Sequence, residues 1–310
     1  MRSRSLLMLV MATSISACGG GGGSSGTKPT PVSATSTKYP SVLTMTFADT
    51  LSGWAAGYTT DYTNKALSQV PGGSATVGIS ASASGLQNVS LTVNGIGGAS
   101  FSEQFSAADL TTSTTVITAD PGTSATLLSG SKTATDGSVR TLTVLDTASS
   151  NFNYMVLGAW EYAPIAGATT TSAAWFASGA GTRPVDIPLT GNATYNGLMV
   201  GRYADGAAIW TVGATANAGA DFANRSIIFN TSNTQLNSPT GTLAAPTLNL
   251  SGTLTYAAGT NNVTGALTTP AGLTGGANAQ FYGPAAAELG GVFFVRDGPK
   301  QMTGSFGVKR

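Results

Sequence analysis

The chain has 310 residues, of which 41% are hydrophobic and only 9% are charged, and 14 Lys and Arg against 13 Asp and Glu give a net charge of +1. This length can bury a substantial core and suggests about two domains, while so few charges exclude the extended basic surface that nucleic acid needs. His is absent and Cys occurs once, which excludes Ser-His-Asp and Cys-His catalysis, His-containing zinc sites and an internal disulfide.

The first 18 residues have the pattern of an export signal that ends at a cysteine. A basic head at Arg2 and Arg4 precedes an apolar core over 6–12, which is too short to cross a bilayer as a mature helix. Small residues then lead to Cys18, and the segment resembles a bacterial lipoprotein signal. This resemblance implies that residues 1–17 are removed and that Cys18 carries acyl chains such as palmitate. The alternatives are an ordinary secretory signal or a free thiol without a role.

Residues 18–41 are expected to form a tether. The run from Gly19 to Gly26 contains only Gly and Ser, which have no side chain able to bury, and Pro29 and Pro31 interrupt the next stretch of chain. A flexible chain of this kind has a typical end-to-end distance of about 25 Å. A phosphate-binding glycine loop is rejected, because no strand precedes these glycines and no Lys-Ser or Lys-Thr comes after them.

Residues 42–150 are expected to form a β-rich domain. Apolar and polar residues alternate at 42–47 and 89–93, which is the period of half-buried strands, and 139–145 is the clearest strand of this part. A single helical turn is expected over 107–110. Turns are expected where Gly can take a positive φ or where Asp or Asn bonds to its own backbone: Pro71-Gly72-Gly73, Asn94-Gly95, Pro121-Gly122 and Asp136-Gly137.

Residues 151–310 are more regular and more aromatic. Successive short strands with few helical interruptions predict a sandwich or a barrel, and closing the sheet into a barrel would leave no unpaired strand edge. Ten strands are expected: 152–162, 173–178, 191–203, 208–216, 225–230, 247–256, 262–267, 279–282, 291–296 and 302–309.

Five segments of this part carry a family resemblance. They are Phe281–Phe293 with its Phe-Tyr-Gly-Pro start, Gly304–Arg310, Tyr154–Trp160, Ala174–Gly179 and Thr190–Gly197. Together they resemble the barrel domain of the transferrin-binding protein B family. The resemblance covers roughly residues 150 to 310, whereas residues 42–150 match only the position of that family's β-rich handle. The 41 glycines and the many Thr, Ser and Ala residues favour an all-β chain. The resemblance implies an N-terminal handle-like domain over 42–150 and a small antiparallel barrel of about eight strands over 151–310.

The segment after Phe281 is expected to be architectural. Gly283-Pro284 ends one strand, residues 285–289 make a helical turn over the barrel mouth, and Gly290-Gly291 turn the chain sharply back into the next strand. Glu288 either caps free backbone N–H groups in that turn or holds a ligand, and the capping role is favoured.

The resemblance implies a binding protein of a Gram-negative bacterium, held in the outer membrane by the lipid on Cys18, with exposure at the cell surface left open. Several family members take part in iron or haem acquisition, so a host or envelope protein partner is expected, without carrying transferrin over as the ligand. The alternative is a structural envelope lipoprotein with no small ligand. No enzyme activity, cofactor or resident metal is predicted, and Cys18 is the one assigned site.

Haem is a possible partner that the residues do not support. Without His, only Tyr or Met could ligate its iron, and each available tyrosine is better explained as a core or rim aromatic. These tyrosines are Tyr154, Tyr162, Tyr195, Tyr203, Tyr256 and Tyr282. An enzyme would need carboxylates such as Glu161, Asp205 and Asp221, whose spacing gives no reason for them to lie together.

Overall fold

The computed structural model describes residues 39–46, 48–49, 51–70, 74–82, 85–119, 123–238 and 241–310. The described residues lie in one folded unit, Ser36–Arg310. The predicted signal over 1–17, Cys18 and the tether up to residue 38 lie outside them, as do the turns predicted at 71–73 and 121–122. No helix among the described residues is both long enough and apolar enough to span a membrane.

The described part of the chain is all-β, as the sequence predicted. Its helical segments are one turn or less: α1 (Thr147–Ser150), η1 (Ala107–Asp109), η2 (Pro184–Asp186), η3 (Pro246–Leu248) and η4 (Pro284–Ala286). The turn expected over 107–110 is therefore confirmed as η1. The expected turn at Asn94-Gly95 is instead a bulge inside a strand, and the chain reverses two residues later at Gly97 and Gly98, which both have positive φ.

Residues 52–179 supply two antiparallel sheets. The smaller sheet contains β3 (Ser74–Ser82), β4 (Gly85–Ile96) and β5 (Ala99–Ser106). The larger sheet has seven strands in the order β2 (Ala66–Gln69), β1 (Ser52–Asp61), β10 (Thr170–Gly179), β9 (Met155–Ala163), β8 (Val139–Leu145), β7 (Thr123–Thr133) and β6 (Thr111–Ala119). The strand predicted over 139–145 is confirmed as β8.

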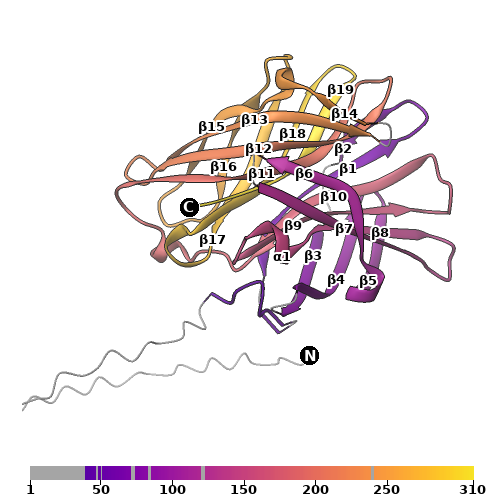
Figure 1. The fold of residues 1–310 in the computed structure, drawn as a ribbon, viewed down its shortest axis with the longest axis horizontal. Coiled ribbons are helices and arrows are strands. Elements are labelled where there is room, and N and C mark those ends of the chain that lie inside the picture. The colour runs from indigo at the N-terminus through magenta and orange to yellow at the C-terminus, as the bar shows by residue number, and fades with distance from the viewer. Residues whose placement is uncertain are drawn as a thin grey trace, which may run out of the picture. The chain divides into compact units, whose positions relative to one another are not determined.

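The C-terminal half closes into an eight-stranded antiparallel barrel, because β12 pairs with both β11 and β13. Figure 1 shows these strands, coloured orange to yellow, wrapped around one interior. Around the barrel they are β11 (Asn192–Ala204), β19 (Lys300–Lys309), β18 (Glu288–Asp297), β17 (Thr274–Tyr282), β16 (Val263–Thr268), β15 (Ser251–Tyr256), β13 (Ser226–Ser238) and β12 (Ile209–Asp221). The short β14 (Gly241–Ala244) pairs only with β13. The expected barrel of about eight strands is confirmed.

Two strands expected to open the barrel pair elsewhere. The segments Tyr154–Trp160 and Ala174–Gly179 form β9 and β10, which lie in the seven-stranded sheet. Both faces of β9 are buried, because Met155 and Leu157 pack toward the barrel while Trp160 packs toward the three-stranded sheet. A strand buried on both faces has the same composition in a sheet layer and in a barrel wall. The division of the chain near residue 150 stays a proposal, and strand pairing places the first barrel strand at Asn192.

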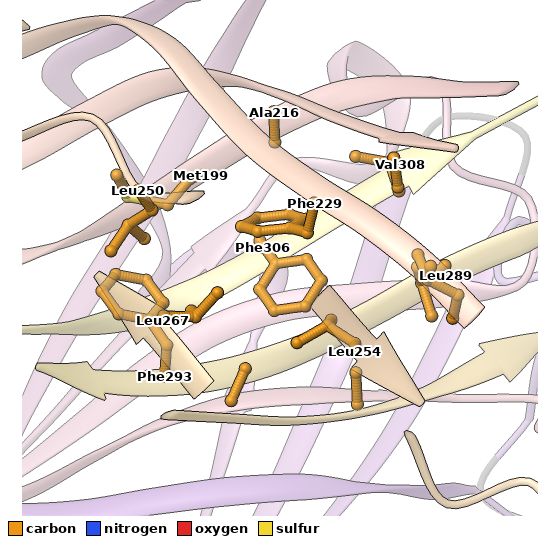
Figure 2. Close-up of a cluster of buried hydrophobic side chains, with 14 of the residues drawn as sticks. Met199, Ala216, Phe229, Leu250, Leu254, Leu267, Leu289, Phe293, Phe306 and Val308 are labelled. Carbon is orange, nitrogen blue, oxygen red and sulfur yellow. The ribbon is translucent and has the colours of Figure 1, made fainter. Parts of the chain in front are cut away.

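The barrel interior is filled by side chains. Thirty-one buried residues from all eight strands and their connections form one cluster, and Figure 2 shows its centre, where Phe229 and Phe306 meet. The centroids of these two rings lie 4.5 Å apart. The barrel is therefore a packed core, and ligand binding must use its outer surface or its ends.

Gly290 and Gly291 serve close packing and not a turn. Both lie inside β18, where a Cβ on Gly290 would come within 2.5 Å of Met155 Sδ and one on Gly291 within 2.3 Å of the Asn278 carbonyl oxygen. The sharp turn lies earlier, at Gly283, Ala285 and Ala286, which all have positive φ. The turn predicted at Gly290-Gly291 is therefore wrong, because glycine is required there by the approach of β9 and β17.

Candidate functional site

The seven-stranded sheet packs on the outer wall of the barrel. Their shared cluster includes Leu157 and Trp175 from the sheet and Leu198 and Val292 from the barrel. Polar contacts fix the orientation of the sheet on the barrel. Trp54 Nε1 donates to the Ala279 carbonyl at 3.0 Å. The hydroxyl of Tyr282 donates to the Ala177 carbonyl at 2.8 Å, and Gln280 Nε2 donates to Ser52 Oγ at 2.6 Å.

An ion pair lies within this junction. Arg202 on β11 donates from NH2 to Glu161 Oε2 on β9 at 2.7 Å, and from NH1 to the Tyr62 hydroxyl at 3.0 Å. Tyr62 and Thr171 both donate to Glu161 Oε1, at 2.5 and 2.6 Å. The Arg202 side chain is 25% exposed and that of Glu161 is 18% exposed. This network is the principal charged link between barrel and sheet.

The environment of the ion pair keeps both groups ionised. Burial by itself would raise the pKa of Glu161, but Arg202 and the hydroxyls of Thr171 and Tyr62 outweigh it and hold that pKa below its usual value. Burial would likewise lower the pKa of Arg202, and the surrounding acidic groups raise it instead. A small cavity of about 120 Å³ beside the Arg202–Glu161 pair is large enough for water but not for a sizeable ligand.

A larger open groove lies between the β1–β2 hairpin and the outer wall of the barrel. It has a volume of about 480 Å³, within the range of ligand sites. Its floor is made by outward-facing residues of β16, β17 and β18, and Gly276 and Phe294 lie opposite each other there. Its polar lining comes from five strands: Ser68, Gln69, Thr264, Thr274, Asn278, Arg296 and Gln301.

The polar side chains of this wall groove have no partners within the described part of the chain. None of the seven makes a side-chain hydrogen bond or ion pair there. Gln301 Oε1 is buried and accepts no hydrogen bond. Six of the seven side chains are exposed and open to an outside molecule, and Gln301 Oε1 is the one buried side-chain atom of this groove without a partner, in a hollow of ligand size. The wall groove is therefore the candidate binding site.

A second hollow, of about 400 Å³, lies at the same end of the barrel. It is lined by Tyr62, Lys65, Arg202 and Trp210 among others, and the ring of Trp210 stacks on Tyr203 with centroids 5.6 Å apart. Lys65 Nζ donates to the Tyr62 carbonyl, and Arg202 is committed to Glu161. These cations are used within the fold, so this hollow offers fewer free polar groups than the wall groove.

Glu288 has a capping role, but for another segment than expected. Its Oε1 accepts from the Asn153 N–H at 2.6 Å and its Oε2 from the Tyr154 N–H at 3.1 Å, which joins the start of β18 to the residues before β9. Burial raises the pKa of Glu288 to about 7, and the N–H donors and Lys309 oppose that shift only in part. The carboxyl group therefore fastens the sheet to the barrel end.

The other residues considered from sequence have structural roles. The Tyr195 hydroxyl donates to the Ala286 carbonyl, and Tyr256 packs edge-on against Phe281. Asp205 and Asp221 accept from backbone N–H groups in turns at opposite ends of β12, and Glu161 pairs with Arg202. These three carboxylates are not brought together. Within the described ranges, no three His, Cys, Asp or Glu side chains cluster as metal ligands.

Sequence reasoning missed both the wall groove and the Arg202 network. The groove residues come from six strands between residues 56 and 301, so no local pattern connects them. Arg202 did carry a signal, because it is a lone charge between Gly201 and Tyr203 in a strand that is otherwise largely buried. A charge at such a position requires a partner.

Comparison with known proteins identifies the kind of barrel. Residues 187–310, which contain β11 to β19, match the family model described as the C-lobe and N-lobe beta barrels of Tf-binding protein B. The resemblance predicted from the sequence is confirmed for this part of the chain. No curated protein matches the chain.

Similar solved structures include transferrin-binding and lactoferrin-binding proteins. A transferrin-binding protein B mutant from Haemophilus parasuis is 18% identical, with a TM-score of 0.48, over 82% of this chain and 44% of that one. The isotype 1 protein from Neisseria meningitidis is 18% identical, with a TM-score of 0.42, over 83% and 43%. The N-lobe of lactoferrin-binding protein B of Moraxella bovis is 14% identical, with a TM-score of 0.32, over 51% and 76%. The chain thus spans less than half of these two transferrin-binding proteins.

Proposed function

We propose that this chain, whose C-terminal barrel is like those of transferrin-binding protein B, is a lipid-anchored envelope protein that binds a ligand or partner protein without catalysing a reaction. It is located in the outer membrane of a Gram-negative bacterium, with the folded part at the cell surface. The observation that carries the proposal is the wall groove, where seven polar side chains converge without partners of their own.

The filled barrel supports binding on the outer wall. Phe229, Phe293 and Phe306 occupy the barrel centre and are each no more than 1% exposed, so a ligand could enter only by displacing the core. The wall groove needs no such rearrangement. Its lining is almost uncharged, with Arg296 as its one ionic group, so its ligand presents amide, hydroxyl or carbonyl groups.

Nutrient acquisition is the biological role that we propose for this binding. The family model and the similar structures concern proteins that bind transferrin or lactoferrin, by their own descriptions. Iron or haem acquisition is one form of this role, and titration of haem into the purified protein tests it. An unshifted haem spectrum would exclude haem as a ligand, and the proposal of a polar ligand in the wall groove would stand.

The lipid anchor on Cys18 has a direct test. We expect radioactive palmitate to label the expressed protein, and expect Cys18→Ala to lose the label completely. Cys18 is the only cysteine, so no other thiol can replace it. A wild-type product that takes up no palmitate would contradict the anchor.

The binding role is tested with a matched pair of double variants. Gln69→Ala with Asn278→Ala removes two exposed amides of the wall groove, and Asn196→Ala with Asn230→Ala removes two exposed amides elsewhere on the barrel wall. Each protein is used to capture molecules from host serum and from extracts of the producer's envelope. We expect a species held by the wild type and the second variant and weakened about tenfold or more by the first.

Two outcomes would argue against the wall groove. Equal retention by both double variants would place binding elsewhere on the surface. No retained species from either source would favour the structural envelope lipoprotein instead.

A further inference from the structure

The loop between β10 and β11 displays two aliphatic side chains to solvent. Val185 is 81% exposed and Leu189 is 84% exposed, and they are the two most exposed among the large hydrophobic side chains of the described residues. The others are Ile165, Ile228 and Leu243, with 62–64% exposed. Two such residues four positions apart form a small apolar surface, which we call the η2 loop surface.

The η2 loop is held firmly on the end of the barrel. Gly181 forms an isolated bridge with Tyr282, and Thr182 Oγ1 donates to the Gly283 carbonyl at 2.6 Å. Ile187 is 5% exposed and belongs to the barrel core. Since Ile187 points inward, Val185 and Leu189 on either side of it are presented outward by a fixed backbone.

The N-terminal arm arrives at this same loop. The hydroxyl of Tyr39, the first described residue, donates to Asp186 and accepts from the Arg183 N–H at 3.1 Å. Three residues later the Val42 N–H donates to the Asn153 carbonyl at 2.7 Å, and Val42 is fully buried. The chain that links Cys18 to the folded unit therefore starts from the η2 loop.

The length of that link keeps the η2 loop near the lipid surface. Residues 19–38 number twenty and are rich in Gly, Ser and Pro. Such a chain has a typical end-to-end distance of about 25 Å, so a lipid on Cys18 holds the loop at a high local concentration over the bilayer. A weak apolar contact that would not form in free solution can then be populated.

The charges of the η2 loop do not oppose contact with lipid. Arg183 Nε donates to Asp186 Oδ2 at 2.9 Å, so the pair beside Val185 is neutral as a unit. The opposite end of the barrel carries the wall groove, where Thr274, Arg296 and Gln301 are register partners. Along β17 that end lies about 27 Å from Tyr282. Contact between the η2 loop and the bilayer therefore leaves the wall groove facing away from the bilayer.

We infer that the η2 loop surface docks on the lipid bilayer that holds acylated Cys18, with Val185 and Leu189 entering the interface and the wall groove turned outward. This inference rests on the lipid anchor of the proposed function. The occupant is lipid because the lipid-bearing end of the chain enters the fold at this loop.

A fluorescent label at Leu189 tests the contact. The acylated protein carrying Leu189→Cys is labelled with nitrobenzoxadiazole and reconstituted into vesicles of phosphatidylethanolamine and phosphatidylglycerol that contain spin-labelled lipid. The same label at Leu243→Cys, on β14 at the groove end, is the matched control. We expect quenching by the spin-labelled lipid to be several-fold stronger at position 189 than at position 243.

Second substitutions show whether the loop itself makes the contact. In the labelled Leu189→Cys protein, Val185→Asp is expected to weaken the docked state about tenfold or more and to reduce quenching toward the Leu243→Cys level. Ile165→Asp, which changes a similarly exposed residue far from the loop, is expected to leave quenching unchanged. Equal quenching at positions 189 and 243, or quenching insensitive to Val185→Asp, would overturn the inference.

The unsubstituted protein separates this inference from the anchor. Its only thiol is Cys18, so it takes up the label only if Cys18 is not acylated. Labelling of the unsubstituted protein would overturn the anchor and the docking together. An unlabelled protein with no preferential quenching at position 189 would overturn the docking alone.

Discussion

Arg202→Ala is expected to lower the free energy of unfolding by about 2–4 kcal/mol, because it leaves the Glu161 carboxylate without its cation at a largely buried position. The lower end of this range reflects the 25% exposure of the Arg202 side chain, which lets water reach the site. The hydroxyl of Tyr62 and that of Thr60 also lose hydrogen bonds from Arg202. Denaturant unfolding followed by tryptophan fluorescence measures the change.

An exposed arginine provides the control for Arg202. Arg183→Ala also removes one partner of an arginine–carboxylate pair, but its side chain is 55% exposed, so we expect a much smaller change than for Arg202→Ala. Replacing both Arg202 and Glu161 by Met is expected to recover part of the loss, because no unpaired charge is left inside. Equal losses for Arg202→Ala and Arg183→Ala would show that the network does not hold the sheet to the barrel.

The same pair predicts an acid dependence. The pKa of Glu161 is held below its usual value in the folded protein, so this carboxylate adds stability above its unfolded pKa, and that stability is lost as the pH falls through the folded pKa. Arg202→Ala removes the main charge that favours the ionised form. The variant should therefore lose less stability than the wild type on acidification.

Phe306→Ala is expected to lower the free energy of unfolding by about 3–5 kcal/mol, the cost of a large cavity in a packed core. Phe306 is fully buried, and its ring lies 4.5 Å from that of Phe229 in the centre of the barrel (Figure 2). The substitution tests whether the barrel is filled, on which binding at the outer wall depends. Denaturant unfolding again gives the value.

The control for Phe306 is an outward-facing residue of the same barrel. Ile228 on β13 is 64% exposed, so Ile228→Ala should change the stability by less than about 0.5 kcal/mol. A cost of less than about 1 kcal/mol for Phe306→Ala would mean that the barrel centre is loosely packed and able to admit a ligand, contrary to its position in the core cluster.

The two ends of the barrel have different roles in the proposed function. The η2 loop, the arm at Tyr39 and Glu288 lie at one end, where the chain from Cys18 enters. The wall groove opens toward the other end, near the turn between β18 and β19. Under the proposed function, a groove at the end away from the anchor faces molecules outside the cell, so the proposed lipid contact and the proposed binding site are compatible.

The sequence by itself determined the fold class and the positions of most barrel strands. Alternation over 262–267 predicted β16 to within one residue, because a strand with one buried face alternates apolar and polar residues along the chain. The segment 302–309 predicted β19 to within two residues, although that strand is buried on both faces. The Phe-Tyr-Gly-Pro segment also indicated the kind of barrel, which the family model confirms over 187–310. The assigned site, Cys18, came from sequence alone and stays a prediction outside the described residues.

Only the tertiary structure decided which strands pair and where the candidate site lies. Strands β9 and β10 are buried on both faces, so their composition does not say whether a barrel or a sheet receives them. Gly290 and Gly291 resemble a turn in sequence, but the approach of Met155 and Asn278 explains them. The wall groove and the Arg202–Glu161 pair join residues from distant strands, and such contacts depend on the register and packing of the whole fold and leave no local pattern.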